Sequence, residues 1–266
     1  MIQHLRAGFL LLLCLTAAPL PAWAGVVIEQ EAKNTETGEV VRMVSYVEPG
    51  RLRMEAQGSA GTLITIFRAD RQVVWTIQPA EKSYQEITQA DVDRMAGQLA
   101  EMRKRQEAML KDLPPEQRAM VEQMMKQQMG GTRPLDVRVN RLGAESVGKF
   151  TTTKYEILTD GERTAELWAT PLAQVELQPA EYETFLQFTR FFKKLSQAAA
   201  RQMASTQVLA RHPEAIEGFP VRVLSYEEGE LVSEQQLVRV ERQPLAEDKF
   251  QLPPGLRKVQ MPGPEL

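Results

Sequence analysis

A charged, methionine-rich stretch interrupts strand-like sequence in the middle of this chain. Seven of the twelve methionines lie between residues 95 and 129, among lysine, arginine and glutamate side chains. The sequence on either side has the alternating and β-branched runs that are typical of strands. Within the stretch, apolar residues recur at steps of three, four and seven, which is the spacing of one face of a helix. The chain must therefore accommodate a helical insert between two β-rich segments.

The insert, residues 89–130, is predicted to be a helical hairpin. The apolar face of its first helix contains Val92, Met95, Leu99, Met102 and Met109. Leu113-Pro114-Pro115 ends this helix, because proline disrupts a helix interior but is accepted in the first turn of the next helix. The apolar face of the second helix contains Met120, Val121, Met124, Met125 and Met129, and Gly130-Gly131 follows as its end.

Strand-like runs surround the insert. From residue 26 to residue 87 they are separated by turn residues at Pro49-Gly50, at residues 58–61 and at Asp70-Arg71. Later in the chain, Asp160-Gly161 between two alternating runs is a strong hairpin signal. The later strand-like runs cover residues 135–139, 151–158, 163–170, 219–226 and 231–240, and a tail follows over residues 250–255.

A third helix is predicted from about residue 180 to residue 210, with a seam of Phe185, Phe188, Phe192, Leu195 and Ala199. An antiparallel sheet with one apolar face needs a cover, and the hairpin and this helix are the amphipathic elements that can supply it. We therefore expect an α+β fold: a curved antiparallel sheet, or half-barrel, with both helical elements on its concave side. No internal repeat or linker divides residues 25–266, so a single domain is expected.

Residues 1–24 have the pattern of a secretory signal peptide. Arg6 precedes an apolar run from Ala7 to Pro21, and Ala22-Trp23-Ala24 places small residues where a signal peptidase cleaves. The apolar run is shorter than the roughly 20 residues that a membrane-spanning helix needs. Cys14 lacks the small preceding residue of a lipoprotein cleavage site. We therefore expect an exported, periplasmic protein without stable membrane insertion.

Removal of the first 24 residues leaves a chain without cysteine, which excludes disulfides and thiolate metal sites. The formal net charge of −3, with basic residues scattered among acidic ones, gives no indication of a nucleic-acid partner. His212 is the only histidine after residue 24, and no nucleophile motif or calcium loop accompanies it. The sequence therefore predicts a protein that is not an enzyme and has no cofactor.

The methionines allow one metal hypothesis, the binding of Cu(I). Thioether sulfur is soft and selects Cu(I), and Met120 and Met124, like Met125 and Met129, are one helical turn apart. The same spacing arises on any amphipathic helix, however, and no histidine or cysteine is nearby to complete a copper site. We therefore assign no metal ligands.

Binding of a hydrophobic ligand accounts for most of these features. Methionine is flexible and polarizable, so a methionine-rich face can adapt to different guests, whereas leucine, isoleucine and valine suit a fixed core. We predict that a lipid or a lipidated protein contacts Met95, Leu99, Met102, Met109, Met120, Met124, Phe185, Phe188 and Phe192. Two alternatives stay open. The methionines can simply fill an irregular helix–sheet interface, or the hairpin can bind an envelope protein as an interaction or sensing module.

Several short motifs lie along most of residues 25–266. They are Asp70 with Val74-Trp75, then Pro79, Lys82 and Tyr84; Asp160-Gly161 with Glu166-Leu167-Trp168; Gly218-Phe219-Pro220-Val221; and Phe250-Gln251-Leu252-Pro253-Pro254-Gly255. Together they resemble a secreted bacterial family of unknown function that is related to the lipoprotein-carrier (LolA/LolB-like) superfamily.

This resemblance implies an unclosed β-barrel whose helices fill its concave side, a shape that holds acyl chains in the carriers. The superfamily also includes envelope-stress regulators that use the same shape to sense lipidated or misfolded proteins. No ligand-contacting residue is carried over from the carriers, because their key positions have no identified counterpart in this sequence. The long methionine-rich hairpin is a departure from the compact lid of the carriers.

Overall fold

The structure is a computed structural model, and it describes residues 24–111, 113, 114, 117, 120, 136–193 and 215–260 of the 266-residue chain. Residues 1–23 of the predicted signal peptide, most of the second predicted helix of the insert and residues 194–210 of the third predicted helix lie outside the described residues.

The described residues form one large sheet and two longer helices. The strands are β1 (Ala24–Asn34), β2 (Val40–Glu48), β3 (Arg51–Gly58), β4 (Gly61–Arg68), β5 (Val73–Gln78), β6 (Ser83–Thr88), β7 (Val137–Val147), β8 (Phe150–Thr159), β9 (Glu162–Thr170), β10 (Phe219–Glu227), β11 (Glu230–Pro244) and β12 (Arg257–Lys258). The helices are α1 (Gln89–Lys111) and α3 (Pro179–Phe191), with the short 3-10 helices η1 (Pro79–Glu81), η2 (Leu172–Val175) and η4 (Glu247–Phe250).

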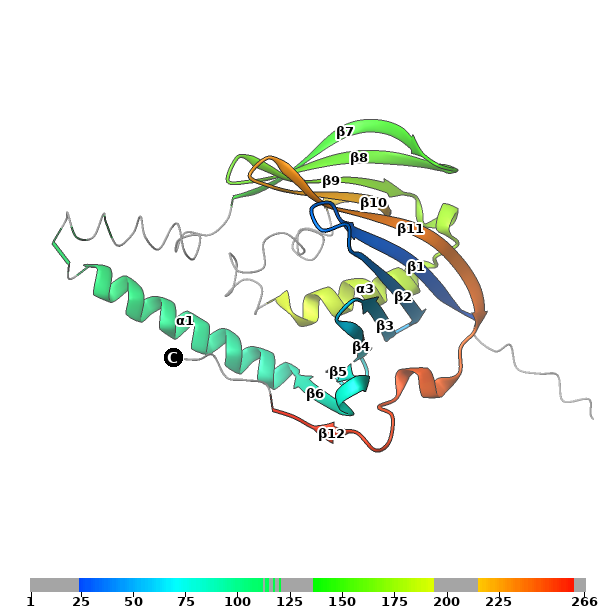
Figure 1. The fold of residues 1–266 in the computed structure, drawn as a ribbon, viewed down its shortest axis with the longest axis horizontal. Coiled ribbons are helices and arrows are strands. Elements are labelled where there is room, and N and C mark those ends of the chain that lie inside the picture. The colour runs from blue at the N-terminus through cyan, green and yellow to red at the C-terminus, as the bar shows by residue number, and fades with distance from the viewer. Residues whose placement is uncertain are drawn as a thin grey trace, which may run out of the picture.

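The sheet consists of two antiparallel meanders that are joined edge to edge. β1 to β6 follow one another in space as they do in sequence, and so do β7 to β11. β1 joins the two meanders by pairing antiparallel with β11, from Ala24 opposite Pro244 to Asn34 opposite Ser233. The sheet is curved and stays open, with β7 at one edge and β12, which is parallel to β6, at the other (Figure 1).

The insert connects opposite sides of this open sheet. It leaves from β6, next to one edge, and returns in β7, which forms the other edge. A hairpin connection needs only two to five residues, whereas this connection runs from residue 89 to residue 136. α1 follows β6 directly and runs along the open side of the arch (Figure 1). Because β6 and β7 are not neighbours in the sheet, a short hairpin turn cannot connect them.

The two faces of β4 and β5 carry different apolar clusters. Phe67 belongs to the large cluster that includes the phenylalanines of α3. Its neighbour Ile66 belongs, with Trp75, to a second cluster that packs against Leu252 and Leu256 of the C-terminal segment. Because successive side chains of a strand point to opposite faces, α3 and the C-terminal segment lie on opposite sides of the sheet. Figure 1 shows α3 inside the arch.

The predicted fold class is confirmed. The chain is α+β, with a curved, unclosed antiparallel sheet and α3 on its concave side (Figure 1). β7 and β11 are longer than the predicted runs over residues 135–139 and 231–240. In β7 a register irregularity near Gly143 follows the predicted run. Such a bulge breaks the alternation of apolar and polar residues, which is why the pattern predicts a shorter β7. The irregularity of β11 lies opposite Glu29, inside its predicted run.

Gly218 explains one of the sequence motifs. It has a φ of +104°, and a Cβ atom at this position would lie 2.2 Å from the carbonyl oxygen of Thr170. The next residue, Phe219, pairs with Thr170 at the start of β10. Glycine is therefore required where the chain enters β10, because no side chain fits between the two backbones.

Candidate ligand-binding face

An ion pair between a buried carboxylate and a partly buried arginine fixes the first turn of α3 to the sheet. The side chain of Glu181 is only 2% exposed, and its Oε1 accepts two hydrogen bonds, of 2.7 and 2.8 Å, from the guanidinium of Arg242 in β11. Its Oε2 accepts a hydrogen bond of 2.8 Å from the backbone N–H of Gln178, as part of a capping box. The same carboxylate therefore both starts the helix and docks it on the sheet.

Thr184, almost one turn further along α3, attaches the helix to the turn between β2 and β3. Its hydroxyl accepts a hydrogen bond of 2.8 Å from the backbone N–H of Gly50 and lies within donating distance, 3.0 Å, of the carbonyl oxygen of Glu48. Thr184 is fully buried. The side-chain carboxyl of Glu48 is also partly buried, and this burial raises its pKa, although the positive charge of Arg51 acts to lower it. The beginning of α3 is thus held by two independent polar contacts.

Four phenylalanines at the end of α3 form its apolar face. Phe188 and Phe191 meet Phe67 of β4 edge-on, with ring centroids 5.6 and 5.8 Å away. The ring centroid of Phe192 lies 5.0 Å from that of Phe191 and 5.4 Å from that of Phe188. Phe185, Phe188 and Phe192, the predicted contacts, are only partly buried, whereas Phe191 is 5% exposed. The structure therefore brings the three predicted phenylalanines into one cluster and adds Phe191, which the predicted seam omits.

The first two turns of α1 pack against the same cluster. Val92 is fully buried, and Met95 is partly buried and packs against the residues that α3 contacts. Leu99 and Met102, in the following turns, are half-buried. Val92 and Met95 of the predicted apolar face thus lie against the sheet.

The distal part of α1 presents a different face from the predicted one. Met109 is 71% exposed, whereas its neighbour Leu110 is only 8% exposed. Met120, which lies beyond the end of α1, is 69% exposed. Leu110 follows Val92 by five helical turns at roughly 3.6 residues per turn, so the two side chains point in the same direction. Met109 is rotated from that direction by roughly 100°. Met124 lies outside the described residues, so its predicted contact stays a prediction.

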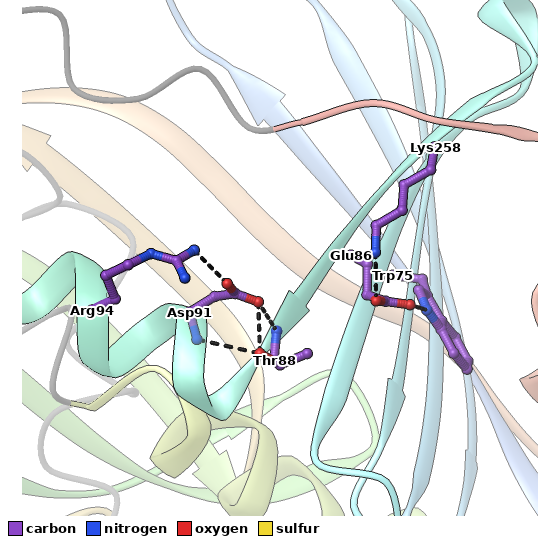
Figure 2. A network of polar contacts seen from close by, with 6 residues as sticks. All are labelled: Trp75, Glu86, Thr88, Asp91, Arg94 and Lys258. Atoms are coloured by element: carbon purple, nitrogen blue, oxygen red, sulfur yellow. Dashed lines mark hydrogen bonds and ion pairs between the residues drawn. The ribbon is translucent and has the colours of Figure 1, made fainter.

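A polar network joins β6 to α1 (Figure 2). Asp91 Oδ2 accepts hydrogen bonds from the hydroxyl and the backbone N–H of Thr88, at 2.6 and 2.9 Å. In return, the backbone N–H of Asp91 donates to the Thr88 hydroxyl at 3.2 Å, and Arg94 pairs with Oδ1. The hydrogen bonds from Thr88, that of its hydroxyl first, lower the pKa of Asp91. This reciprocal arrangement caps the first turn of α1.

Replacing Asp91 by asparagine should remove the pH dependence that this cap gives to the free energy of unfolding. Because the folded-state pKa of Asp91 is lowered from 3.8, its stabilising effect is complete well above that value and is lost as the pH falls through the lower folded-state pKa. We expect the wild type to be more stable than Asp91→Asn by about 1 kcal/mol at neutral pH, the usual effect of a helix cap. The difference should shrink below a pH of about 4. Urea unfolding at a series of pH values measures it.

Asp93→Asn provides the matched control, because Asp93 is an exposed carboxylate in the same turn. It changes the net charge equally but leaves the bonds to Thr88 in place. The interpretation would be wrong if both variants lost the same stability, or if the loss in Asp91→Asn did not depend on pH.

A second polar cluster lies on β8, β9 and β10 and is not visible in the sequence pattern. Lys154, Trp168 and Arg222 are in register on these strands, and the two cations stand 4.7 and 5.1 Å from the centre of the indole. Glu166 accepts hydrogen bonds from Lys154 at 3.0 Å and from the Tyr226 hydroxyl at 2.8 Å. Burial acts to raise the pKa of Glu166, but these bonds outweigh it and the pKa is lowered. Glu166 is therefore an ionised, hydrogen-bonded carboxylate and is not poised to donate a proton.

Among the described residues, no three His, Cys, Asp or Glu side chains are grouped so that they could hold a metal ion. Of the methionines in the copper hypothesis, Met120 is exposed, and Met124, Met125 and Met129 lie outside the described residues. Over the same residues, no helix combines the length and the apolar character that crossing a bilayer requires.

The fold and its inner face define the chain as an open half-barrel with α3 on its concave side. Residues 89–256 match the family described as "Domain of unknown function (DUF4412)", and the chain belongs to this family. The match begins at α1 and continues through the second meander to the C-terminal segment. No curated protein matches the chain. The prediction of a family of unknown function is confirmed.

Several solved structures resemble the chain at low sequence identity. An uncharacterised conserved protein from Thermus thermophilus is 11% identical over 90% of this chain and 91% of its own, with a TM-score of 0.45. The MucA/MucB complex from Pseudomonas aeruginosa gives 11% identity over 90% of this chain and 59% of that one, with a TM-score of 0.35. A LolA superfamily protein from Nitrosomonas europaea is 7% identical over 88% of this chain and 92% of its own, with a TM-score of 0.28. The superfamily that the motifs indicate is thus among the matches, but scores at this level support no transfer of function.

Proposed function

We propose that this protein is a non-enzymatic periplasmic binding protein that holds a hydrophobic ligand, a lipid or a lipidated protein, between its curved sheet and its helices. The observation that carries the proposal is that both helices keep large apolar side chains only partly buried against the apolar cluster of the sheet. These side chains are Met95 of α1 and Phe185, Phe188 and Phe192 at α3. Leu99 and Met102 are half-buried further along α1.

The chemistry of these side chains suits a guest of variable shape. Phenylalanine supplies large apolar area, and methionine changes rotamer easily to follow an irregular surface. Each acyl methylene that leaves water for such surroundings contributes about 0.8 kcal/mol. Ten methylenes would contribute roughly 8 kcal/mol before the cost of ordering the ligand, which is the range of micromolar binding.

A fatty acid that carries an anthroyloxy fluorophore tests the proposal. We expect the wild type to bind it, and Leu99→Glu to bind it at least tenfold more weakly, because the substitution places a charge at a half-buried apolar position of α1. Met109→Glu is the matched control, since it adds the same charge to the same helix at an exposed position. Circular dichroism verifies that both variants are folded.

Two results would contradict the proposal. One is the absence of probe binding to the wild type, together with a solvent extract of the natively purified protein that contains no lipid. The other is an equal loss of affinity in Leu99→Glu and Met109→Glu, which would mean that the half-buried part of α1 has no special role.

A second function, the binding of a partner protein by the insert, is favoured by one observation. Met109 and Met120 of the insert are the two most exposed large apolar side chains among the described residues, and apolar side chains exposed on one segment can form part of a protein interface. Site-specific photo-crosslinking in cells from position 109 tests this alternative. Position 238, an exposed valine of β11, is the control, and a crosslinked protein at 109 alone would support it.

A further inference from the structure

The buried polar side chains of α3 have hydrogen-bond partners, with one exception. Both carboxylate oxygens of Glu181 accept hydrogen bonds, and the Thr184 hydroxyl bonds to the turn between β2 and β3 and to its own helix. The exception is Gln187, whose side-chain oxygen Oε1 is buried and has no hydrogen-bond partner. Among the described residues, no other buried side-chain nitrogen or oxygen atom is left unpaired.

Gln187 is attached to the side of α3 that faces the sheet. Residues three and four positions apart on a helix are neighbours on one face. Thr184, three positions before Gln187, is fully buried, and Phe191, four positions after it, meets Phe67 of β4 edge-on. Gln187 as a whole is only half-buried, whereas its oxygen is removed from solvent. The carboxamide therefore starts between a fully buried residue and the aromatic cluster inside the arch.

An unpaired buried oxygen destabilises the folded chain. The oxygen gives up its hydrogen bonds to water and receives no donor in exchange. Native proteins pair the great majority of such atoms, so each exception has a physical reason. Leucine is similar in size to glutamine and would avoid this penalty at position 187. The unpaired oxygen is explained if a bound molecule supplies the donor.

We propose that Gln187 is a ligand-binding residue that accepts a hydrogen bond from a hydroxyl group of the bound lipid. This inference rests on the proposed function, because it specifies the chemistry of the same hydrophobic ligand. The apolar chain of the lipid contacts Phe185, Phe188 and Phe192, which are only partly buried. Such a site combines an apolar lining with a polar group that fixes the orientation of the ligand.

A neutral hydroxyl suits this oxygen better than the other polar groups that a lipid can carry. It brings a single O–H donor, which Gln187 Oε1 can accept. An ammonium group brings a charge and three donors, and a primary amide brings two donors, so buried donors would stay unpaired. An ionised carboxylate has no donor for Oε1. The ligand class is therefore an apolar chain with a free hydroxyl, as in a long-chain alcohol or an acylglycerol.

Two matched compounds test the proposal by displacing the anthroyloxy fatty acid from the full chain. Dodecanol carries the O–H donor, whereas methyl dodecyl ether has the same chain and oxygen but no donor. We expect Gln187→Leu to weaken the binding of dodecanol at least about fivefold and to change that of the ether less than about twofold. Gln98→Leu is the matched control, because it makes the same substitution at an exposed position of α1.

Unfolding of the ligand-free protein gives a second readout. Gln187→Leu removes the unpaired oxygen and should raise the urea concentration at the midpoint of unfolding, whereas Gln98→Leu should leave it unchanged. Dodecanol should then raise the midpoint of the wild type more than that of Gln187→Leu. A side chain that only supports the fold would show the opposite, a lower midpoint when it is replaced.

Two results would overturn this inference and leave the proposed function intact. The first is an equal change in the affinities for dodecanol and for the ether in Gln187→Leu, which would mean that the side chain only shapes the site. The second is a lower midpoint for ligand-free Gln187→Leu, which would mean that the oxygen already has a partner. Failure of the wild type to bind the fatty acid and both compounds would overturn the proposed function as well.

Discussion

Replacing Arg242 by alanine should lower the free energy of unfolding by about 3 kcal/mol, the lower end of the loss for a buried ion pair, because Arg242 itself is 23% exposed. The carboxylate of Glu181 is 2% exposed and receives both guanidinium hydrogen bonds on one oxygen. Without Arg242 this charge would stay buried and uncompensated, or the first turn of α3 would leave the sheet to hydrate it. Urea unfolding followed by far-ultraviolet circular dichroism measures the loss.

Two variants separate the burial of the charge from the removal of an arginine. Arg42→Ala breaks an ion pair with Glu31 in which both side chains are largely exposed, and should cost about 0–1 kcal/mol. Glu181→Leu combined with Arg242→Met removes both charges but also the capping bond to Gln178, and should cost about 1–2 kcal/mol, less than Arg242→Ala alone. If Arg242→Ala were no more destabilising than Arg42→Ala, the pair would not be what docks α3.

The elements that depend on local pattern could be predicted from the sequence. Asp160-Gly161 turns between β8 and β9, and the change of period at Thr88 marks the boundary between β6 and α1. Turn chemistry and periodicity are contained in neighbouring residues, so a short window is sufficient to recognise them. The same reasoning locates α3, although the described helix begins at Pro179 and ends at Phe191.

The pairings between distant segments could not be predicted in this way. β1 pairs with β11, and β12 joins the far edge beside β6, yet alternation within a strand does not identify its neighbour. The sequence pattern misses the Glu181–Arg242 contact for the same reason, because the two residues are 61 positions apart. The sequence pattern also places Met109 on the apolar face of α1, because its spacing fits a seven-residue repeat. In a straight helix that position is rotated away from the buried side, and Leu110 takes its place there.

Replacing Phe67 by alanine should also cost about 3–5 kcal/mol, the usual result for a buried phenylalanine. Phe67 is 3% exposed and is the point on β4 that both Phe188 and Phe191 of α3 contact. Its removal would leave a cavity beneath the aromatic face of the helix. Leu63→Ala on the same strand is the control, since Leu63 is 42% exposed and should change stability by no more than about 0.5 kcal/mol.

The same variant connects the stability of α3 with the proposed ligand. A double-mutant cycle of Phe67→Ala and Phe188→Ala should give a coupling energy of about 0.5–1.5 kcal/mol, because their rings meet edge-on. If a hydrophobic ligand lies between α3 and the sheet, it can fill the space left by Phe67, and a saturating fatty acid should then stabilise Phe67→Ala more than it stabilises the wild type. Equal stabilisation of Phe67→Ala and Leu63→Ala would place the ligand away from this aromatic cluster. A coupling energy of zero would mean that the two rings contribute to the core independently.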